Sequence, residues 1–368
     1  METKWSLNKV LMSSVAALLA ATGTFAAEAS SDQKSCQEQP GPFAFCYPRD
    51  VGLACPNDFY AHGQFLLMRS AEDGLEYAIS NTNGTDNFPL DGGTISGYHS
   101  NGHSWKWDYG VRAGFGFYMG KDLWNVEAQW THVKTHENNS TMVRAGCLDA
   151  YWLPADVDAS AITRSSAQWR VKYDTFDVSF AKPFHASRYF VLQPQVGIRA
   201  AWIDQHYLAR YAGSIMDHDG TYIQDGAEMK GKNDFWGVGL RSGFTSEYIL
   251  GSGWSLHTSI NGALLYGKFH LDQECPIEGT EGDDLSTEIH HDPYVVVPNM
   301  DISLGLGWGH LFDHDKYRFS IKVAYEFHQW WKQMRLRRFF DTGEPVSNET
   351  VYGDYSLNGL SFAVQFDF

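Results

Sequence analysis

Twelve charged residues lie among large apolar side chains in short segments spread along this sequence. They are Lys106, Asp108, Arg112, Glu127, Arg170, Lys172, Arg199, Arg241, Asp301, Arg318, Lys322 and Glu326. On the inner wall of a membrane pore, such side chains would line a water-filled path and set its ion preference. Alternatively, residues of opposite charge would pair across a narrow barrel and close it. The sequence leaves both interpretations open.

Two His–Asp clusters offer a different chemistry, His290–His291–Asp292 and Asp217–His218–Asp219. A histidine beside a carboxylate could activate water in a hydrolase or bind a metal ion. Both clusters fall in long polar segments, where side chains of this kind are usually only solvated. We therefore predict no catalytic residues, no cofactor and no metal site.

The elements that must position these residues are segments with a two-residue period. In the last segment, Leu360, Phe362, Val364, Phe366 and Phe368 alternate with small or polar residues. Side chains of a β-strand point alternately to its two faces, so this segment has one apolar face. Ten segments with this alternation are predicted to be strands: residues 58–69, 105–119, 123–135, 168–182, 189–205, 233–249, 254–269, 294–311, 317–331 and 355–368.

The connections between these strands alternate between long and short along the whole chain. Bacterial outer-membrane barrels have this pattern, with long external loops, short periplasmic turns and an even number of strands. Aromatic residues also gather at both ends of the segments, as two membrane-interface girdles require. The sequence predicts an all-β fold: a transmembrane antiparallel up-and-down β-barrel of about ten strands over residues 58–368. A hairpin within the first or second long loop would make twelve.

The predicted strand at residues 168–182 is less regular than the other nine. The alternation of apolar residues slips phase between Tyr173 and Phe176. An extra residue in one strand of an antiparallel pair shifts the phase in this way, so we expect a β-bulge there.

Residues 1–29 have the composition of a cleaved signal peptide. Lys4 and Lys9 supply positive charge, an apolar run covers residues 10–21, and Ala26 and Ala29 offer small residues for cleavage. Residues 30–57 are rich in Pro and Cys and are predicted to be a periplasmic arm. The net charge of −16 provides no basic surface for phosphates, so we expect no nucleic-acid partner.

The five cysteines would then reach an oxidising compartment, where disulfides form. They are Cys36, Cys46, Cys55, Cys147 and Cys275. Cys147 and Cys275 fall in two long loops and are candidates for one bond. The other three lie in the arm, where one bond would leave a thiol for a disulfide-linked envelope protein. A local loop staple or free thiols are the alternatives.

Several stretches resemble the major outer membrane protein family of Legionella and Chlamydia-related bacteria. They are FYAHGQFLLMRSAEDGLEYAIS at residues 59–80, SRYFVLQPQVGIRAAWI at 187–203, NDFWGVGLRSGF at 233–244 and FAVQFDF at 362–368. The resemblance implies a pore-forming or structural protein of the outer membrane with disulfide cross-linking in the envelope. It brings no catalytic residues.

These observations predict a non-enzymatic barrel in the bacterial cell outer membrane that passes small polar solutes and has a structural envelope role. The alternatives are a non-conducting surface barrel, such as an adhesin or loop scaffold, and a barrel hydrolase. The expected partners are outer-membrane lipid and the barrel assembly machinery, which would read the C-terminal strand ending at Phe368.

Overall fold

The computed structural model describes most of the predicted barrel region. The described residues are 59–81, 94–97, 106–119, 124–142, 147–153, 157–187, 189–217, 221–277, 286–313, 317–340 and 347–368. The predicted signal peptide, the predicted arm and Cys36, Cys46 and Cys55 lie outside them. Among the described residues, no helix is long and apolar enough to cross a membrane.

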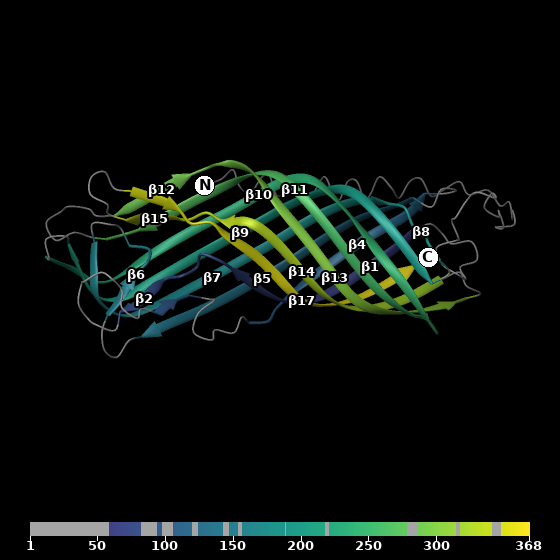
Figure 1. Ribbon diagram of the computed structural model, residues 1–368, viewed down its shortest axis with the longest axis horizontal. Helices are drawn as coiled ribbons and strands as arrows, with labels where there is room; N and C mark the ends of the chain where they lie inside the picture. The colour runs from purple at the N-terminus through teal and green to yellow at the C-terminus, as the bar shows by residue number, and fades with distance from the viewer. Residues whose placement is uncertain are drawn as a thin grey trace. The chain divides into compact units, whose positions relative to one another are not determined.

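Ten long antiparallel strands form the wall of a closed barrel (Figure 1). In chain order they are β1 (Phe59–Glu72), β4 (Asp108–Met119), β5 (Trp124–Met142), β7 (Val157–Ala181), β9 (Phe190–Asp217), β10 (Tyr222–Gly251), β11 (Trp254–Cys275), β13 (Tyr294–Phe312), β14 (Tyr317–Met334) and β17 (Gly353–Asp367). Each pairs with the next, and the last pairs with the first from Glu72–Tyr355 to Tyr60–Asp367. The predicted fold and the strand number of ten are confirmed.

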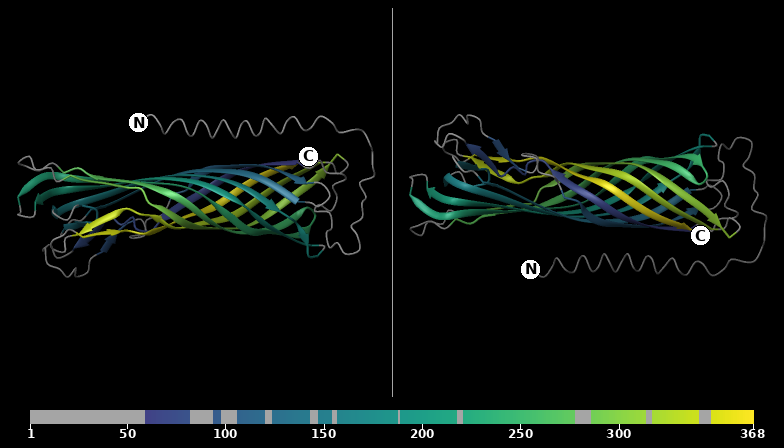
Figure 2. Two further views of the ribbon diagram at one scale, coloured as in Figure 1. Left: turned by 90° about the horizontal axis from the view of Figure 1, so that it is seen from above. Right: turned by 90° about the horizontal axis from the view of Figure 1, so that it is seen from below.

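Short strands gather at the long-loop end of the barrel. β2 (Ala78–Asn81), β3 (Thr94–Ser96) and β6 (Cys147–Ala150) form a three-stranded sheet, and β15 (Arg337–Phe340) pairs with β16 (Ser347–Thr350). β12 (Thr287–His291) pairs antiparallel with the last residues of β11, Leu271 to Cys275. The C-terminus and β8 (Phe184–His185) lie at the opposite end (Figures 1 and 2).

Several strands are much longer than a membrane crossing requires. β9 has 28 residues and β10 has 30, whereas about ten residues cross the bilayer. Residues 206–232, which the sequence predicts as a loop, are mostly the continuous hairpin of these two strands. The barrel wall therefore continues beyond the membrane on the long-loop side.

The two faces of the wall exchange polarity along the longest strands, such as β9 and β10, which explains why the sequence underestimates the length of these strands. Near the short turns, apolar side chains such as Leu240, 72% exposed, point outward. Further along the same strand Phe235 points inward with 1% exposure, and Lys230 points outward. We call the first part the membrane half and the second the outer half. Water surrounds the outer half, so its apolar residues turn inward.

This exchange of polarity also accounts for the predicted bulge near Tyr173, which the structure contradicts. The pairing of β7 with both neighbours runs without a register shift from Ser165 to Ala181. Tyr173 points inward in the outer half, and Phe176 lies on the opposite face of the strand. The apolar phase changes because the surroundings change, and no residue is inserted.

Inward aromatic residues fill the lumen of the outer half. We call this group the aromatic core: Trp169, Tyr173, Phe235, Phe269, Trp330 and Tyr355, all at most 2% exposed. Trp169 meets Tyr355, and Tyr173 meets Trp330, edge to face with ring centres 6.0 Å apart. Edge-to-face contacts suit the charge distribution of aromatic rings.

Aromatic residues also mark both edges of the lipid-facing surface. On the long-loop side we call the exposed residues the outer girdle: Trp107, Trp130, Trp236, Tyr266 and Tyr294. Trp124 and Trp254 are exposed near the short turns. Trp169 and Tyr355 also lie next to long loops, where a girdle is expected, but they point inward and belong to the aromatic core.

Candidate functional site in the lumen

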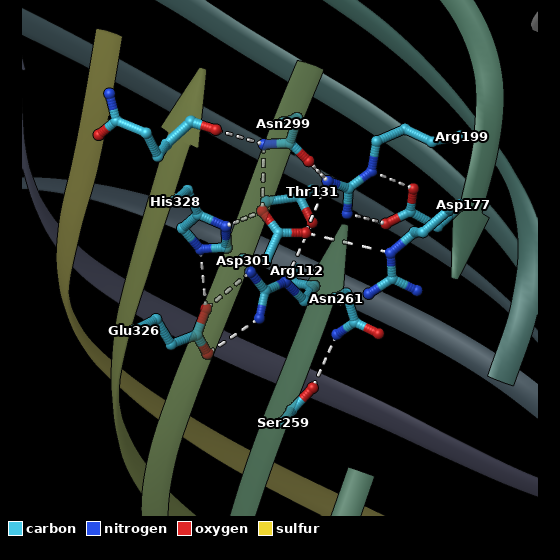
Figure 3. Close-up of polar contacts among 12 residues, drawn as sticks. Arg112, Thr131, Asp177, Arg199, Ser259, Asn261, Asn299, Asp301, Glu326 and His328 are labelled. Carbon is cyan, nitrogen blue, oxygen red and sulfur yellow. Dashed lines mark hydrogen bonds and ion pairs between the residues drawn. The ribbon is translucent and has the colours of Figure 1, made fainter. Parts of the chain in front are cut away.

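Five strands of the wall bring six ionisable side chains together inside the membrane half. We call them the charge network: Arg112 of β4, Asp177 of β7, Arg199 of β9, Asp301 of β13, and Glu326 and His328 of β14. Each occupies an inward position of its alternating strand, and each is at most 9% exposed. Figure 3 shows them converging from different parts of the wall.

Arg112 makes a two-pronged ion pair with Glu326. The two guanidinium NH groups donate to the two carboxylate oxygens over 3.0 and 2.8 Å. Its Nε donates to the hydroxyl of Thr131 over 3.0 Å, and one NH group also reaches Gln64. Planar, two-pronged contacts are the strongest form of this pair, because two charge-assisted hydrogen bonds share one geometry.

Arg199 is the second centre of the charge network. It donates to both oxygens of Asp177 over 2.7 and 2.8 Å and lies 2.6 Å from Asp301. It also donates to Asn299. Arg199 is only 3% exposed. Two carboxylates compensate a charge that would otherwise be very costly to remove from water.

His328 joins the two centres. Its Nδ1 lies 2.8 Å from Asp301, and its Nε2 lies 3.2 Å from Glu326. A third guanidinium, that of Arg241, lies 4.0 Å from Asp301. The cross-lumen contacts tie β4, β7, β9, β13 and β14 together, so the charge network braces the barrel from inside.

Two polar cavities lie beside the charge network. The larger, of about 250 Å³, is lined by Tyr60, His62, Glu127 and Lys322 as well as by the network. The smaller, of about 90 Å³, includes Arg318 near the short turns. His62, Gln64 and Lys322 line both. The membrane half therefore holds adjoining polar spaces that are large enough for several water molecules.

The aromatic core borders these cavities on the long-loop side. Tyr173 lines the larger cavity, and its ring packs against Trp330 and Tyr355. Trp330 and Tyr355 are completely buried. In this conformation the lumen therefore changes from a polar cavity to a packed apolar interior.

Comparisons with known proteins can now be set beside this geometry. No curated protein matches the chain. The model of the family described as Legionella pneumophila major outer membrane protein precursor matches residues 54–368. The chain belongs to this family. The protein is accordingly a barrel of the bacterial outer membrane.

The chain also has a distant similarity to several solved structures. The outer membrane protease OmpT of Escherichia coli is 10% identical, with 85% of this chain and 97% of that chain covered and a TM-score of 0.38. The toluene transporter TodX of Pseudomonas putida is 10% identical, with 85% and 90% covered and a TM-score of 0.29. The toluene transporter TbuX of Ralstonia pickettii is 11% identical, with 84% of this chain and 89% of that chain covered and a TM-score of 0.25.

Eight of the twelve charged residues predicted from the sequence line the two cavities of this family member. They are Arg112, Glu127, Arg199, Arg241, Asp301, Lys322 and Glu326 around the larger cavity, and Arg318 at the smaller.

The other four lie elsewhere. Arg170 and Lys172 point outward from β7 in the outer half, where Lys172 lies 3.2 Å from Asp174. Their prediction as inward residues was wrong because the faces exchange polarity before this point. Lys106 is exposed ahead of β4, and Asp108 at the start of β4 accepts a hydrogen bond from the backbone N–H of His136.

Sequence reasoning missed Asp177 and His328 of the charge network. Asp177 would follow from carrying the alternation of β7 unbroken through Tyr173 and Thr175. His328 lies on the inward face that the alternation of residues 317–331 predicts, but its bridging role depends on Asp301 from another strand. Such cross-lumen contacts require the three-dimensional register.

The structure also bears on the cysteines in the long loops. Cys275 is a free thiol and is buried at the end of β11, so the predicted bond between Cys147 and Cys275 is not formed. Burial, with a smaller contribution from Glu228, raises the pKa of the Cys275 thiol to about 12. A buried thiol with so little thiolate is unreactive.

Proposed function

We propose that this protein is a closed structural barrel. Its membrane half anchors the protein in the outer membrane, and its outer half is a rigid extension at the cell surface. The observation that carries this proposal is the aromatic core, which occupies the lumen of the outer half with Trp330 and Tyr355 at 0% exposure. A solute moving along the barrel axis would have to displace these rings from one another.

The size of the barrel supports the same proposal. Eight-stranded barrels are just filled by side chains, whereas porins of sixteen or more strands leave an aqueous channel. Ten strands lie near the filled end of this range. The charge network adds a second closure, because Arg112 and Arg199 hold partners contributed by other strands.

A porin-like channel for small polar solutes is the second candidate function. Two observations favour it: the adjoining cavities of about 250 and 90 Å³, and lining residues of both charge signs. Charged walls of this kind set ion preference in open channels. Passage through this barrel would require the aromatic core to open.

Conductance in planar lipid bilayers separates the two candidates. The full chain would be compared with a Trp330→Ala/Tyr355→Ala variant, which thins the aromatic core, and with Trp254→Ala/Tyr266→Ala, which removes two lipid-facing rings. We expect no steady channels from the full chain or from the lipid-face variant. We expect the core variant to open at least intermittently.

Folding of each variant is checked by the shift in gel mobility on heating. Steady channels from the folded, unaltered chain would overturn the closed barrel and establish the porin. A folded core variant that stays silent would show that the aromatic core is not the seal.

We also propose two partners from the outer surface and the last strand. Val364 and Phe366 point outward with 47% and 37% exposure, as contact with membrane lipid requires. The strand that ends near Phe368 forms the closing seam with β1, so it is the element that we propose the assembly machinery reads. Disulfide-linked envelope partners remain a prediction about the arm cysteines.

A further inference from the structure

Four ionisable side chains meet on the outside of the barrel, next to the outer girdle. The pairing of β11 with β12 puts Asp272 directly opposite His290. His270 and Asp292 each lie two residues away from one of these, so alternation puts all four on one face. Tyr266 and Tyr294 of the outer girdle, 61% and 58% exposed, mark this face as outward and adjoin the cluster.

Three of the side chains present ligand atoms to a common centre. Three potential ligand atoms lie within 4.8 Å of one another, one each from His270, Asp272 and His290. The Nε2 of His270 is 3.1 Å from Asp272 Oδ2, and the Nδ1 of His290 is 2.6 Å from Asp272 Oδ1. One carboxylate therefore lies between two imidazole nitrogens.

The fourth side chain orients one of the imidazoles. Asp292 Oδ1 is 2.7 Å from Nδ1 of His270, and Asp292 Oδ2 accepts a hydrogen bond from Lys268 Nζ over 2.7 Å. Asp292 therefore holds the His270 ring from the side away from Asp272.

The contact with an oxygen of Asp292 favours the His270 tautomer with its proton on Nδ1. The lone pair of Nε2 then faces the common centre beside Asp272. Metal-binding histidines almost always make such a contact from the nitrogen that does not bind the metal. An ordinary surface ion pair does not require a second carboxylate on the far nitrogen of the imidazole.

We propose that His270, Asp272 and His290 bind a divalent transition-metal ion of the Zn²⁺ or Co²⁺ type on the outer face of the barrel. Two imidazole nitrogens and one carboxylate suit these ions better than Mg²⁺ or Ca²⁺, which prefer oxygen ligands alone. The His290 side chain is 61% exposed, so a fourth coordination position would be open to solvent. This proposal departs from the prediction from sequence that the chain has no metal site.

The sequence alone could not assemble this site. The sequence cluster at His290–His291–Asp292 contributes one ligand and one orienting carboxylate, whereas His270 and Asp272 come from the neighbouring strand. Residues 273–289 separate Asp272 from His290 in the sequence, so only the strand register brings the two pairs together.

Titration of the purified full chain in detergent tests the proposal. CoCl₂ is added while visible absorbance reports four-coordinate Co²⁺, ZnCl₂ is used to displace it, and calorimetry gives the stoichiometry. We expect one ion per chain. His290→Ala and Asp272→Asn should abolish binding, and Asp292→Asn should weaken it by about 10- to 100-fold.

His291→Ala is the matched control, because it removes the adjacent imidazole of β12 that does not contribute to the cluster. It should bind Co²⁺ as the unaltered chain does. The proposal is overturned if the folded, unaltered chain shows no four-coordinate absorbance. Equal binding by the His290→Ala variant would also overturn it.

Discussion

Arg199 shows what a single side chain contributes inside the lumen. It lies between Asp177 and Asp301 with almost no exposure to water. Arg210, further along the same strand, pairs with Glu228 on the outside and its side chain is 53% exposed. The two arginines therefore make the same kind of contact in opposite surroundings.

Replacing each arginine by methionine should give very different losses of stability. Arg199→Met leaves two buried carboxylates without their main partner, so we expect unfolding in urea to become easier by about 3–5 kcal/mol. Arg210→Met should change the free energy of unfolding by less than about 1 kcal/mol, because water screens the exposed pair. Similar losses for the two variants would contradict the bracing role of the charge network.

Among the strands, β9 carries the exchange of polarity in full. Ile198 points outward in the membrane half and is 54% exposed. His206 points outward from the same strand eight residues later, where Asp204 and Arg210 also point outward. Lipid surrounds the first position, and water surrounds the second.

Arginine placed at these two positions tests the exchange directly. Ile198→Arg should cost about 2–4 kcal/mol, since a charge near the bilayer midplane loses its hydration. His206→Arg should cost well under about 1 kcal/mol. Both are measured by urea unfolding and refolding in lipid vesicles. An equal cost at the two positions would show that the outer half is also embedded in lipid.

The parts of these strands that could be predicted from sequence are those in the membrane half. There a single rule, apolar outside and polar inside, covers every strand, and the short turn from Gly251 to Gly253 has positive φ angles at all three residues. The predicted start of β11 at Trp254 agrees with the structure. The sequence predicts its end at Phe269, whereas the strand runs to Cys275. Beyond the outer girdle the rule reverses, and residues of a continuing strand have the composition of a loop.

The candidate site was predictable to a similar extent. Inward residues such as Arg112 and Glu326 follow from alternation, but their pairing joins residues more than two hundred positions apart. Closure of β17 on β1 determines which strands face each other across the lumen. A pattern with a period of two holds no information on that geometry.

At the scale of the whole molecule, the lumen of the barrel has two parts along its axis, one polar in the membrane half and one apolar in the outer half. The polar interior of the membrane half should admit water, whereas the aromatic core should exclude it. Hydrogen exchange measured by mass spectrometry distinguishes them from a uniformly hollow barrel. Peptides spanning residues 203–215 and 263–275 should exchange slowly despite water on their outer face, because packed side chains hold their backbone hydrogen bonds closed. Rapid exchange there would contradict a packed outer half.

The exchange of polarity also fixes how deeply the molecule sits in its bilayer. On β10, Trp236 and Lys232 point outward only four residues apart, and β11 has the same sequence of aromatic then charged side chains at Tyr266 and Lys268. Movement toward the periplasm would draw ammonium and carboxylate groups into hydrocarbon, and movement the other way would lift Leu and Val side chains into water. Vertical displacement is opposed in both directions, so the outer half is held at one fixed height relative to the bilayer.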